Sequence, residues 1–260
     1  CESWRNLISV GATPIAITNC LNFGSPEKED NMGEFVECVT GISEASKYLS
    51  FPVVSGNVSF YNQTKEVGIK PTPVIGGIGL IKDYKKMVTM DFKDEENIIL
   101  VIGKTEGHLD QSLFARTILD ENNGPPPEIN LFNEKNNGET LLKLIGNNFV
   151  RSAHDVSLGG IIVAISKMCI KGNIGIKLKK PHSLLSELEY FFSEDQGRYI
   201  IEIKKSDIKK VTNFLEKNLV HFDEVGTLKG KSVIFDEKTI VPIDELRSYN
   251  TNWLTNYMSK

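Results

Sequence analysis

The sequence predicts two domains, a sheet-based α+β domain followed by an α/β domain. At 260 residues the chain is long enough for two cores of ordinary size. Apolar segments with strand character alternate along it with segments of helical periodicity. The charged stretch Asp91–Asn97 separates two apolar runs and marks a domain junction. We therefore expect domains at residues 1–90 and 97–260.

The first domain is predicted to contain a sheet covered by one long helix. The opening residues read as the tail of a helix already under way, without an initiator Met, which suggests a fragment of a longer polypeptide. Residues 33–49 carry apolar side chains at helical spacing, and Asn31 is a plausible N-cap. Val53 and Val54 supply β-branched bulk for a buried strand. We expect strands at residues 13–19, 52–60 and 72–82.

The second domain is predicted to begin with a strand that is buried on both faces. Residues 98–103 form a continuous apolar run of the kind found in such strands. Three prolines within Gly124–Glu128 mark a loop, because proline stiffens the backbone and removes hydrogen-bond donors. Helices are expected at 111–119, 137–147, 158–169 and 206–215, and strands at 173–178, 197–203, 223–227 and 232–235.

The composition excludes several classes of protein. Charged residues make up 25% and hydrophobic residues 40% of the chain, as in an ordinary globular protein. A formal net charge of -4 without a basic stripe argues against nucleic-acid binding. No apolar run approaches a membrane span and no charged leader opens the chain, so we expect a cytoplasmic protein with a small-molecule substrate. The cysteines show no zinc or disulfide spacing, and none is expected to bind metal: Cys1, Cys20, Cys38 and Cys169.

Three predicted strands end or begin in polar or glycine-rich turns. The most informative is Pro52–Asn62, in which Gly56 lacks a Cβ that would collide with a ligand and Asn57 and Ser59 offer neutral oxygens. Neutral oxygens of this kind are suitable ligands for the Mg²⁺ ion of a magnesium-nucleotide complex. Taken singly, each segment is equally a strand with an ordinary turn, since Asn, Gly and Pro also occur in turns for conformational reasons. The other two segments are Ile17–Gly24 and Lys70–Ile81.

Four segments, in the same order as in a known family, resemble the second half of the synthetase subunit of phosphoribosylformylglycinamidine synthase, the PurL family. They are Thr18–Glu27, Ser55–Asn62, Pro71–Gly79 and Ala153–Gly160. The resemblance covers most of the chain. It implies a PurM-like fold, with an N-terminal domain whose sheet joins that of a neighbour and a C-terminal α/β domain packed against it.

The resemblance implies an ATP-dependent ligase of purine biosynthesis that uses ATP and Mg²⁺. The family's catalytic histidine lies in the first half, so no catalytic residue is expected in this chain, which alone should be inactive. By resemblance, Gly56 and Asn19 contact ATP, Asn57 supplies an oxygen to magnesium and Ser59 contacts the substrate. Many relatives carry aspartate where this chain has Asn19, and a neutral amide attracts magnesium less strongly.

The resemblance also implies partners. These are the missing N-terminal half of the same synthetase, the glutaminase subunit PurQ and the small subunit PurS. Because a domain built to pair with a missing homologue exposes an apolar sheet face or edge, we expect the isolated fragment to form a homodimer.

A second group of residues allows less specific expectations. Asp155, with Ser157 and Gly159 at a helix start, either holds a metal or phosphate in an auxiliary site or only caps the helix. The segment Ser193–Arg198 is expected to form a strand-entry turn in which Arg198 pairs with a neighbouring acid. The following residues are expected to be solvated side chains of a glycine-rich loop: Lys104, Glu106 and His108.

Two other functions remain open at this point. The fold could carry a different reaction, as in AIR synthetase or selenophosphate synthetase. Alternatively, the chain could be a non-catalytic module that dimerises through its sheet and binds nucleotide structurally. The segments Asn22–Glu27 and Pro71–Pro73 favour the PurL reaction.

Overall fold

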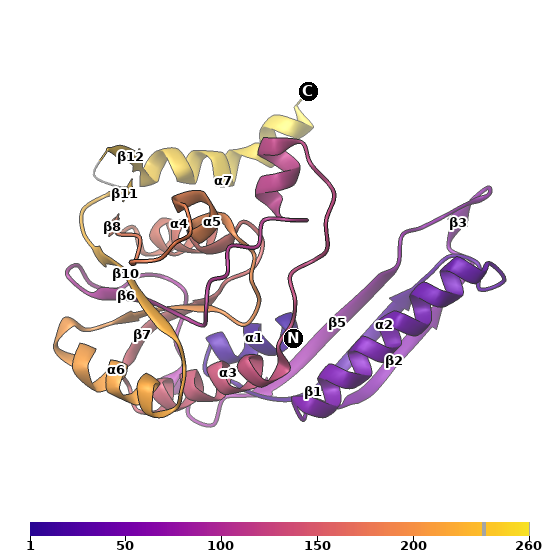
Figure 1. The fold of residues 1–260 in the computed structure, drawn as a ribbon, viewed down its shortest axis with the longest axis horizontal. Coiled ribbons are helices and arrows are strands. Elements are labelled where there is room, and N and C mark those ends of the chain that lie inside the picture. Colours follow the sequence, from indigo (N-terminus) through magenta and orange to yellow (C-terminus); the bar gives the residue numbers. More distant parts are fainter. Residues whose placement is uncertain (236–237, 260) are drawn as a thin grey trace. The chain divides into compact units, whose positions relative to one another are not determined.

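The computed structural model describes residues 1–235 and 238–259, and the chain divides into two units (Figure 1). Unit 1 comprises Cys1–Ile8 and Ala12–Lys82, and unit 2 comprises Ser9–Gly11 and Asp83–Lys260. The division between residues 82 and 83 precedes the charged stretch Asp91–Asn97, which lies in unit 2. No helix in the described part of the chain combines the length and apolar character that a membrane span needs.

Unit 1 contains a three-stranded sheet in the order β2-β1-β5, with β1 parallel to β2 and antiparallel to β5. The residues of β1 that face the helices, such as Ile17 and Leu21, are buried, whereas Thr18 between them is exposed. The bounds of its elements are α1 (Glu2–Ser9), β1 (Thr13–Asn22), α2 (Glu29–Tyr48), β2 (Val53–Ser59), β3 (Gln63–Thr64), β4 (Val67–Gly68) and β5 (Thr72–Leu80).

Helix α2 begins four residues before its predicted start and lacks the predicted cap. Its N-cap residue is Lys28, which makes no side-chain capping bond. Asn31 instead donates its side-chain amide to the carbonyl oxygen of Ser25 at 2.9 Å, so the prediction of an Asn31 cap was wrong. The Phe35 ring packs edge-on against the rings of Phe23 and Phe60, at centroid distances of 5.2 and 5.1 Å. These aromatic contacts hold the helix to its own sheet.

The sheet face opposite the helices is open, and its β5 part is apolar. Along β5 the side chains of Val74, Ile78 and Leu80 are 54%, 57% and 51% exposed. Val53 and Val54 on β2 are 43% and 64% exposed, so the prediction of a buried strand was wrong. The physical reason is that β2 lies at the edge of a sheet of only three strands.

Unit 2 is built on a seven-stranded sheet in the order β12-β11-β8-β10-β6-β9-β7. Neighbouring strands are antiparallel except for the parallel pair β8 and β11. All five residues of β6 are buried, which confirms the predicted two-sided strand. The strand bounds are β6 (Ile98–Ile102), β7 (Val150–Asp155), β8 (Ile176–Leu178), β9 (Tyr199–Ile203), β10 (Phe222–Leu228), β11 (Ser232–Phe235) and β12 (Thr239–Pro242).

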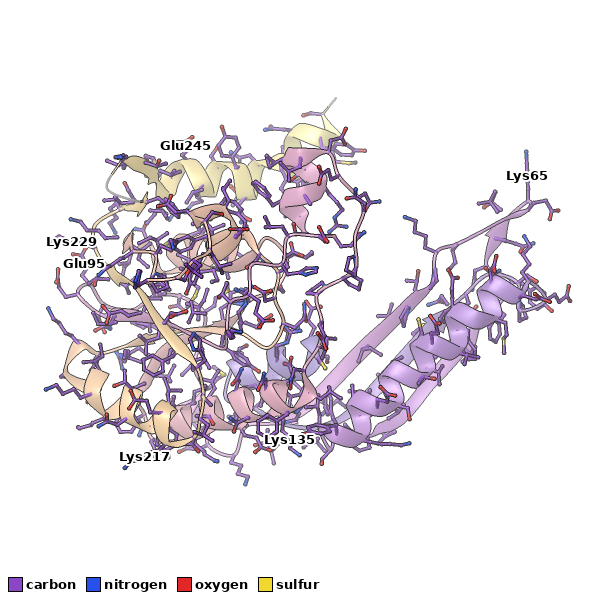
Figure 2. The ribbon with its side chains drawn as sticks, viewed as in Figure 1. Lys65, Glu95, Lys135, Lys217, Lys229 and Glu245 are labelled. Carbon is purple, nitrogen blue, oxygen red and sulfur yellow. The ribbon has the colours of Figure 1, made fainter. Side chains whose placement is uncertain are left out.

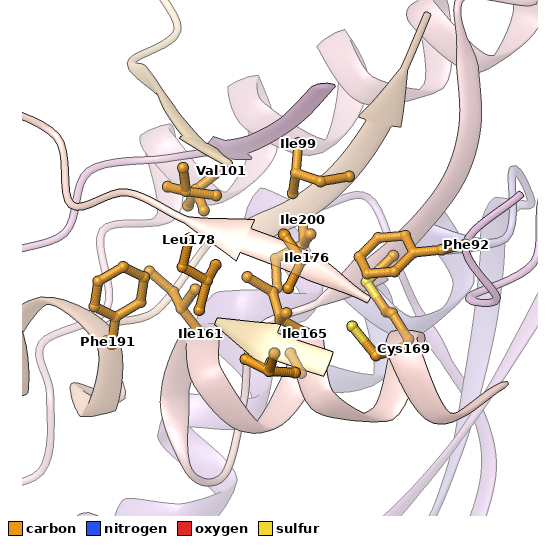
Figure 3. Close-up of a cluster of buried hydrophobic side chains, with 14 of the residues drawn as sticks. Phe92, Ile99, Val101, Ile161, Ile165, Cys169, Ile176, Leu178, Phe191 and Ile200 are labelled. Carbon is orange, nitrogen blue, oxygen red and sulfur yellow. The ribbon is translucent and has the colours of Figure 1, made fainter. Parts of the chain in front are cut away.

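Helices cover both faces of this sheet (Figure 1). Helices α3 (Leu131–Gly146) and α6 (Ile208–Lys217) lie on one face, and α4 (Gly160–Gly172), α5 (Glu187–Phe192) and α7 (Ile243–Met258) lie on the other. Figure 3 shows the core beneath α4, where Ile161 and Ile165 pack against strand residues such as Ile99. Charged side chains such as Lys217 and Lys229 project outward (Figure 2).

The structure extends or adds several elements. Helix α3 starts at Leu131, before the predicted residue 137, because the Asn130 side chain accepts a hydrogen bond from the Asn133 N–H. The predicted helix 111–119 is largely a π-helical segment, Ala115–Leu119. Elements that the sequence patterns did not predict are β7, α5, β12 and α7, the β3–β4 hairpin, and the short 3-10 turns Tyr84–Lys86 and Lys205–Asp207.

The charged stretch Asp91–Asn97 is fastened to unit 2 by one buried carboxylate. Glu202, a fully buried residue of β9, accepts hydrogen bonds from the backbone N–H groups of Lys93 (2.9 Å) and Asp94 (3.1 Å). It also accepts from the Asn97 side-chain amide and the Ser152 hydroxyl, each at 2.7 Å. The segment is therefore held at fixed points on the sheet, although its charge pattern indicates a linker.

Candidate functional site

The four candidate residues of the first domain lie on the neighbouring strands β1 and β2. In the parallel register Asn19 pairs with Gly56, Cys20 with Asn57 and Asn22 with Ser59. The predicted segments Ile17–Gly24 and Pro52–Asn62, which are far apart in sequence, thus lie side by side. Strand β5, from the segment Lys70–Ile81, pairs with the other edge of β1.

Asn19 and Gly56 share the face of the sheet that carries the helices. A Cβ placed on Gly56 would lie 1.9 Å from Oδ1 of Asn19 and 2.7 Å from its backbone oxygen. The absence of a side chain at Gly56 therefore makes room for the Asn19 amide. Next to Asn19, a hollow of about 360 Å³ lies between the sheet and α2, lined mainly by apolar residues such as Leu21 and Ile42.

Asn57 and Ser59 face the opposite, open side of the sheet, because side chains alternate along a strand. Asn57 is exposed, next to Cys20 in a shallow hollow of about 500 Å³. Asn62 donates its side-chain amide to the Ser59 hydroxyl at 3.2 Å and to two backbone oxygens, so it shapes the turn. The candidates thus form two pairs on opposite faces of the sheet, Asn19 with Gly56 on the helix side and Asn57 with Ser59 on the open side.

Asn57 offers the kind of oxygen that magnesium accepts, but only one such donor. Mg²⁺ takes six oxygen ligands in a near-octahedral arrangement, often from phosphates and water. Among the described residues no group of three or more His, Cys, Asp or Glu side chains is arranged to hold a metal ion. Asn57 therefore offers one of the six oxygens that such a site needs and does not by itself form a magnesium site.

Asp155 lies at the end of β7, is 5% exposed, and has its Oδ1 3.0 Å from Nδ1 of His154. The nearby start of α4 already holds an anion. The Glu194 carboxylate accepts hydrogen bonds from the backbone N–H groups of Gly159 and Leu113 on the same oxygen, Oε1, each at 2.7 Å. A phosphate at this helix start would have to displace Glu194, which is 8% exposed.

The neighbouring acid, Asp195, organises the loop that follows β6. Its carboxylate accepts from three consecutive backbone N–H groups, those of Glu106, Gly107 and His108, at 3.0, 3.1 and 3.2 Å. Arg198, which is fully buried, lies 3.8 Å from Asp195 Oδ2, confirming the predicted pairing with a neighbouring acid. Sequence reasoning missed the roles of Glu194 and Asp195, although two adjacent acids ahead of a buried strand are the signal that could have found them.

The cysteines are not arranged for reactivity. Burial raises the pKa of the Cys169 thiol to about 12, so it stays protonated at neutral pH. The pKa of Cys38 is also raised, by burial and by the nearby carboxylates of Glu34 and Glu37. The structure thus gives neither thiol the electropositive surroundings that a reactive cysteine needs.

Comparisons with known proteins agree with this two-unit architecture. The N-terminal domain model of the AIR synthase related proteins matches residues 1–81, and the C-terminal domain model of the same family matches residues 94–236. The chain is 72% identical over 258 residues to the phosphoribosylformylglycinamidine synthase subunit PurL of Pelagibacter ubique. That match covers 99% of this chain and 35% of the relative, so the chain spans about a third of the relative's length.

Solved structures share the fold. The Thermotoga maritima PurL complexed with ATP superimposes with a TM-score of 0.69 at 19% identity, covering 94% of this chain and 39% of that one. The PurLQS structure from the same organism gives a TM-score of 0.72 at 18% identity, covering 94% and 40%. Since the C-terminal domain model alone spans more than half of the residues, the chain belongs to the AIR synthase related protein family.

Proposed function

We propose that this chain is a C-terminal fragment, from the second half, of the synthetase that makes formylglycinamidine ribonucleotide in purine biosynthesis. The observation that carries the proposal is the 72% identity to a PurL subunit along 99% of the chain. That level of identity favours PurL over AIR synthetase or selenophosphate synthetase, because the fold alone serves many reactions.

In the proposed reaction, the γ-phosphoryl group of ATP moves to the amide oxygen of formylglycinamide ribonucleotide and ADP leaves. Ammonia then attacks the same amide carbon, and inorganic phosphate departs to leave the amidine. Mg²⁺ would neutralise charge on the phosphates. Such chemistry depends on positioning and charge neutralisation more than on a protein nucleophile.

The proposed contributions of this half are binding contacts. Asn19 and Gly56 would contact ATP, Asn57 would give its side-chain oxygen to Mg²⁺, and Ser59 would contact the ribonucleotide. The location of all four on two adjacent strands supports a shared role. Asp155 remains a candidate for an auxiliary site only, since the Glu194 carboxylate fills the neighbouring helix start.

The proposal includes partners and a location. The missing N-terminal half would supply the catalytic histidine and cover the open sheet face, and PurQ with PurS would supply ammonia. The choice of PurQ and PurS as partners is supported by the Thermotoga maritima relative, which was solved as PurLQS. The enzyme would work in the cytoplasm. The isolated 260-residue chain would have no synthetase activity.

The test is a kinetic assay on the full-length synthetase with ammonia as nitrogen donor. Asn57→Ala should lower kcat by about tenfold or more, because a lost magnesium contact weakens charge neutralisation in the transition state. Asn213→Ala, which changes an exposed asparagine of α6, is the matched control and should leave kcat unchanged. Absence of ribonucleotide-dependent ATP hydrolysis in the wild type would refute the function, and unchanged kinetics of Asn57→Ala would remove that residue from the site.

The open sheet face gives a second test. In the isolated chain the exposed apolar side chains of β5 should drive pairing of two copies, since a contiguous apolar sheet face is rarely left in water. Ile78→Glu should abolish the pairing in sedimentation velocity runs. A wild-type chain that stays monomeric at high concentration would contradict this expectation.

A further inference from the structure

A polar cleft in unit 2 lies outside the residues discussed for the synthetase reaction. Its volume is about 680 Å³, within the range of small-molecule sites. Its walls come from the loop after β6, the first turns of α3, the turn before β9 and the segment before β10. The residues that matter for recognition are Lys104, Asn133, Glu134, Asn137, Gln196 and His221. Three further carboxylates line the cleft, those of Glu106, Glu128 and Asp195. Asp195 is compensated by backbone N–H groups and Arg198, and Glu106 by Lys104, whereas Glu128 is exposed to solvent.

The cleft is held open by contacts that do not depend on a ligand. The loop containing Lys104 is fixed because the Asp195 carboxylate accepts the N–H groups of residues 106–108. Asn137, which is 7% exposed, donates its side-chain amide to the carbonyl oxygen of Gly197 at 2.9 Å. Gly103 at the start of the loop has a φ of +93°, and a Cβ there would lie 2.7 Å from the Gly197 oxygen. Two walls are therefore locked to each other.

One end of the cleft carries the Lys104 ammonium and the His221 imidazole. Gly103, the residue before Lys104, donates its backbone N–H to the His221 carbonyl oxygen at 2.8 Å, which places both residues at the same end. The Asp223 carboxylate lies 3.4 Å from His221 Nε2 and raises the pKa of that imidazole. Lys104 also pairs with Glu106 at 2.8 Å, but the pair is more than 60% exposed and contributes little energy. Lys104 can therefore turn to a bound anion at little cost.

The remainder of the cleft suits hydroxyl groups. Asn133 presents an exposed amide that can both donate and accept, and Glu134 adds a carboxylate that is 1% exposed. The amides of Asn137 and Gln196 also line the cleft, and each is oriented by donating one hydrogen bond to a backbone oxygen, that of Gly197 and of Glu194 respectively. Among the described lining residues, Leu219 is the only apolar side chain, and no Phe, Tyr or Trp offers a ring for stacking. A nucleobase would find no flat apolar surface here, whereas a sugar would find partners for its hydroxyls.

We propose that this cleft binds a phosphorylated sugar without a nucleobase, with the phosphate at Lys104 and His221 and the sugar hydroxyls at the amides and Glu134. All of its lining residues belong to unit 2. Its occupancy does not depend on the reaction proposed above.

Isothermal titration calorimetry on the full-length protein tests the assignment with four probes: ribose 5-phosphate, ribose, inorganic phosphate and AMP. Ribose 5-phosphate should bind at least about tenfold more tightly than ribose or inorganic phosphate, because each of these two smaller probes occupies only one end of the cleft. AMP should bind no more tightly than ribose 5-phosphate through this cleft. Ribose 5-phosphate that binds no more tightly than inorganic phosphate, or fails to bind at millimolar concentration, would overturn the proposal.

Variants then locate the binding. Lys104→Gln and His221→Gln should each weaken ribose 5-phosphate binding by about tenfold, the value of one charge-assisted contact. The matched control Lys205→Gln changes an exposed lysine outside the cleft and should have no effect. Asn57→Ala should also leave this binding unchanged, which separates the cleft from the proposed active site. Binding that survives in the Lys104 and His221 variants, or that disappears in Asn57→Ala, would place the ligand elsewhere and refute the assignment.

Discussion

The Glu202 carboxylate gives the most quantitative prediction, because its four hydrogen bonds are donated by groups in two separate segments, the stretch Asp91–Asn97 and β7. Its Oε2 accepts from the Lys93 N–H and the Ser152 hydroxyl, and its Oε1 accepts from the Asp94 N–H and the Asn97 amide. The substitution Glu202→Gln keeps the size and shape of the side chain. It replaces one accepting oxygen with an NH₂ group.

The arrangement of the donors sets the magnitude. The Ser152 hydroxyl can rotate and the Asn97 amide can flip to accept from the new NH₂, but neither backbone N–H can reverse. Whichever way the glutamine is oriented, the N–H of Lys93 or of Asp94 faces another donor. A buried donor without an acceptor costs about 1–3 kcal/mol, and the remaining bonds weaken when the charge is lost. We expect a total loss of about 2–4 kcal/mol in the free energy of unfolding of unit 2.

Two measurements check this expectation. Urea unfolding followed by circular dichroism gives the global change, and native-state hydrogen exchange reports on the amides of Lys93 and Asp94 directly. Glu216→Gln makes the same chemical change at an exposed position of α6 and should stay within about 0.5 kcal/mol of wild type. In Glu202→Gln, both amides should exchange faster.

A specific result would refute the reasoning. If Glu202→Gln unfolded at the wild-type urea concentration and left both amides equally protected, the hydrogen bonds would contribute no net stability. The desolvation free energy of burying the charged carboxylate would then equal the stabilisation from its four hydrogen bonds.

Three further predictions concern local packing and pH. Gly56→Ala should lower the free energy of unfolding of unit 1 by about 1–3 kcal/mol, because the new Cβ would collide with Asn19. Urea unfolding measures this change. An unfolding free energy equal to that of the wild type would contradict the pairing of β1 with β2 in this register. Gly33→Ala, in α2 with nothing within 4 Å of the new methyl, should instead stabilise by about 0.5–1 kcal/mol, and a loss would refute the helix assignment. The pKa of His221 is raised, so its pairing with Asp223 stabilises the fold below pH 6.5 and this contribution is lost as the pH rises through the folded pKa. Thermal unfolding of His221→Gln should therefore differ from wild type at pH 5.5 by more than at pH 8.5, and an equal difference would exclude the pairing.

Much of the architecture followed from local patterns. The apolar run at residues 98–103 became the fully buried strand β6, and the helical spacing at 33–49 became most of α2. The order of the polar segments was enough for the resemblance to PurL. These features are legible because periodicity and burial of a continuous apolar run depend on neighbours within the same element.

The arrangement of the candidate site did not follow from these patterns. Asn19 and Gly56 share one face of the sheet while Asn57 and Ser59 face the other, and the register between β1 and β2 shifts between Ile17 and Thr18. A shift of one residue reverses the side to which every later side chain points. The face on which each residue lies is therefore a property of strand pairing, which no local pattern records.

The amino-acid order alone determined the strongly periodic helices and the apolar strands, the polar character of the turns and the family resemblance, because these rest on residue type and short-range spacing. Only the tertiary structure decided that the Glu194 and Asp195 carboxylates accept hydrogen bonds from backbone N–H groups of distant loops. It also decided that Lys104 and His221 line the same cleft. The reason is physical: those relations join residues about 35 to 120 positions apart, and the contacts between them exist only once the sheet has brought the loops together.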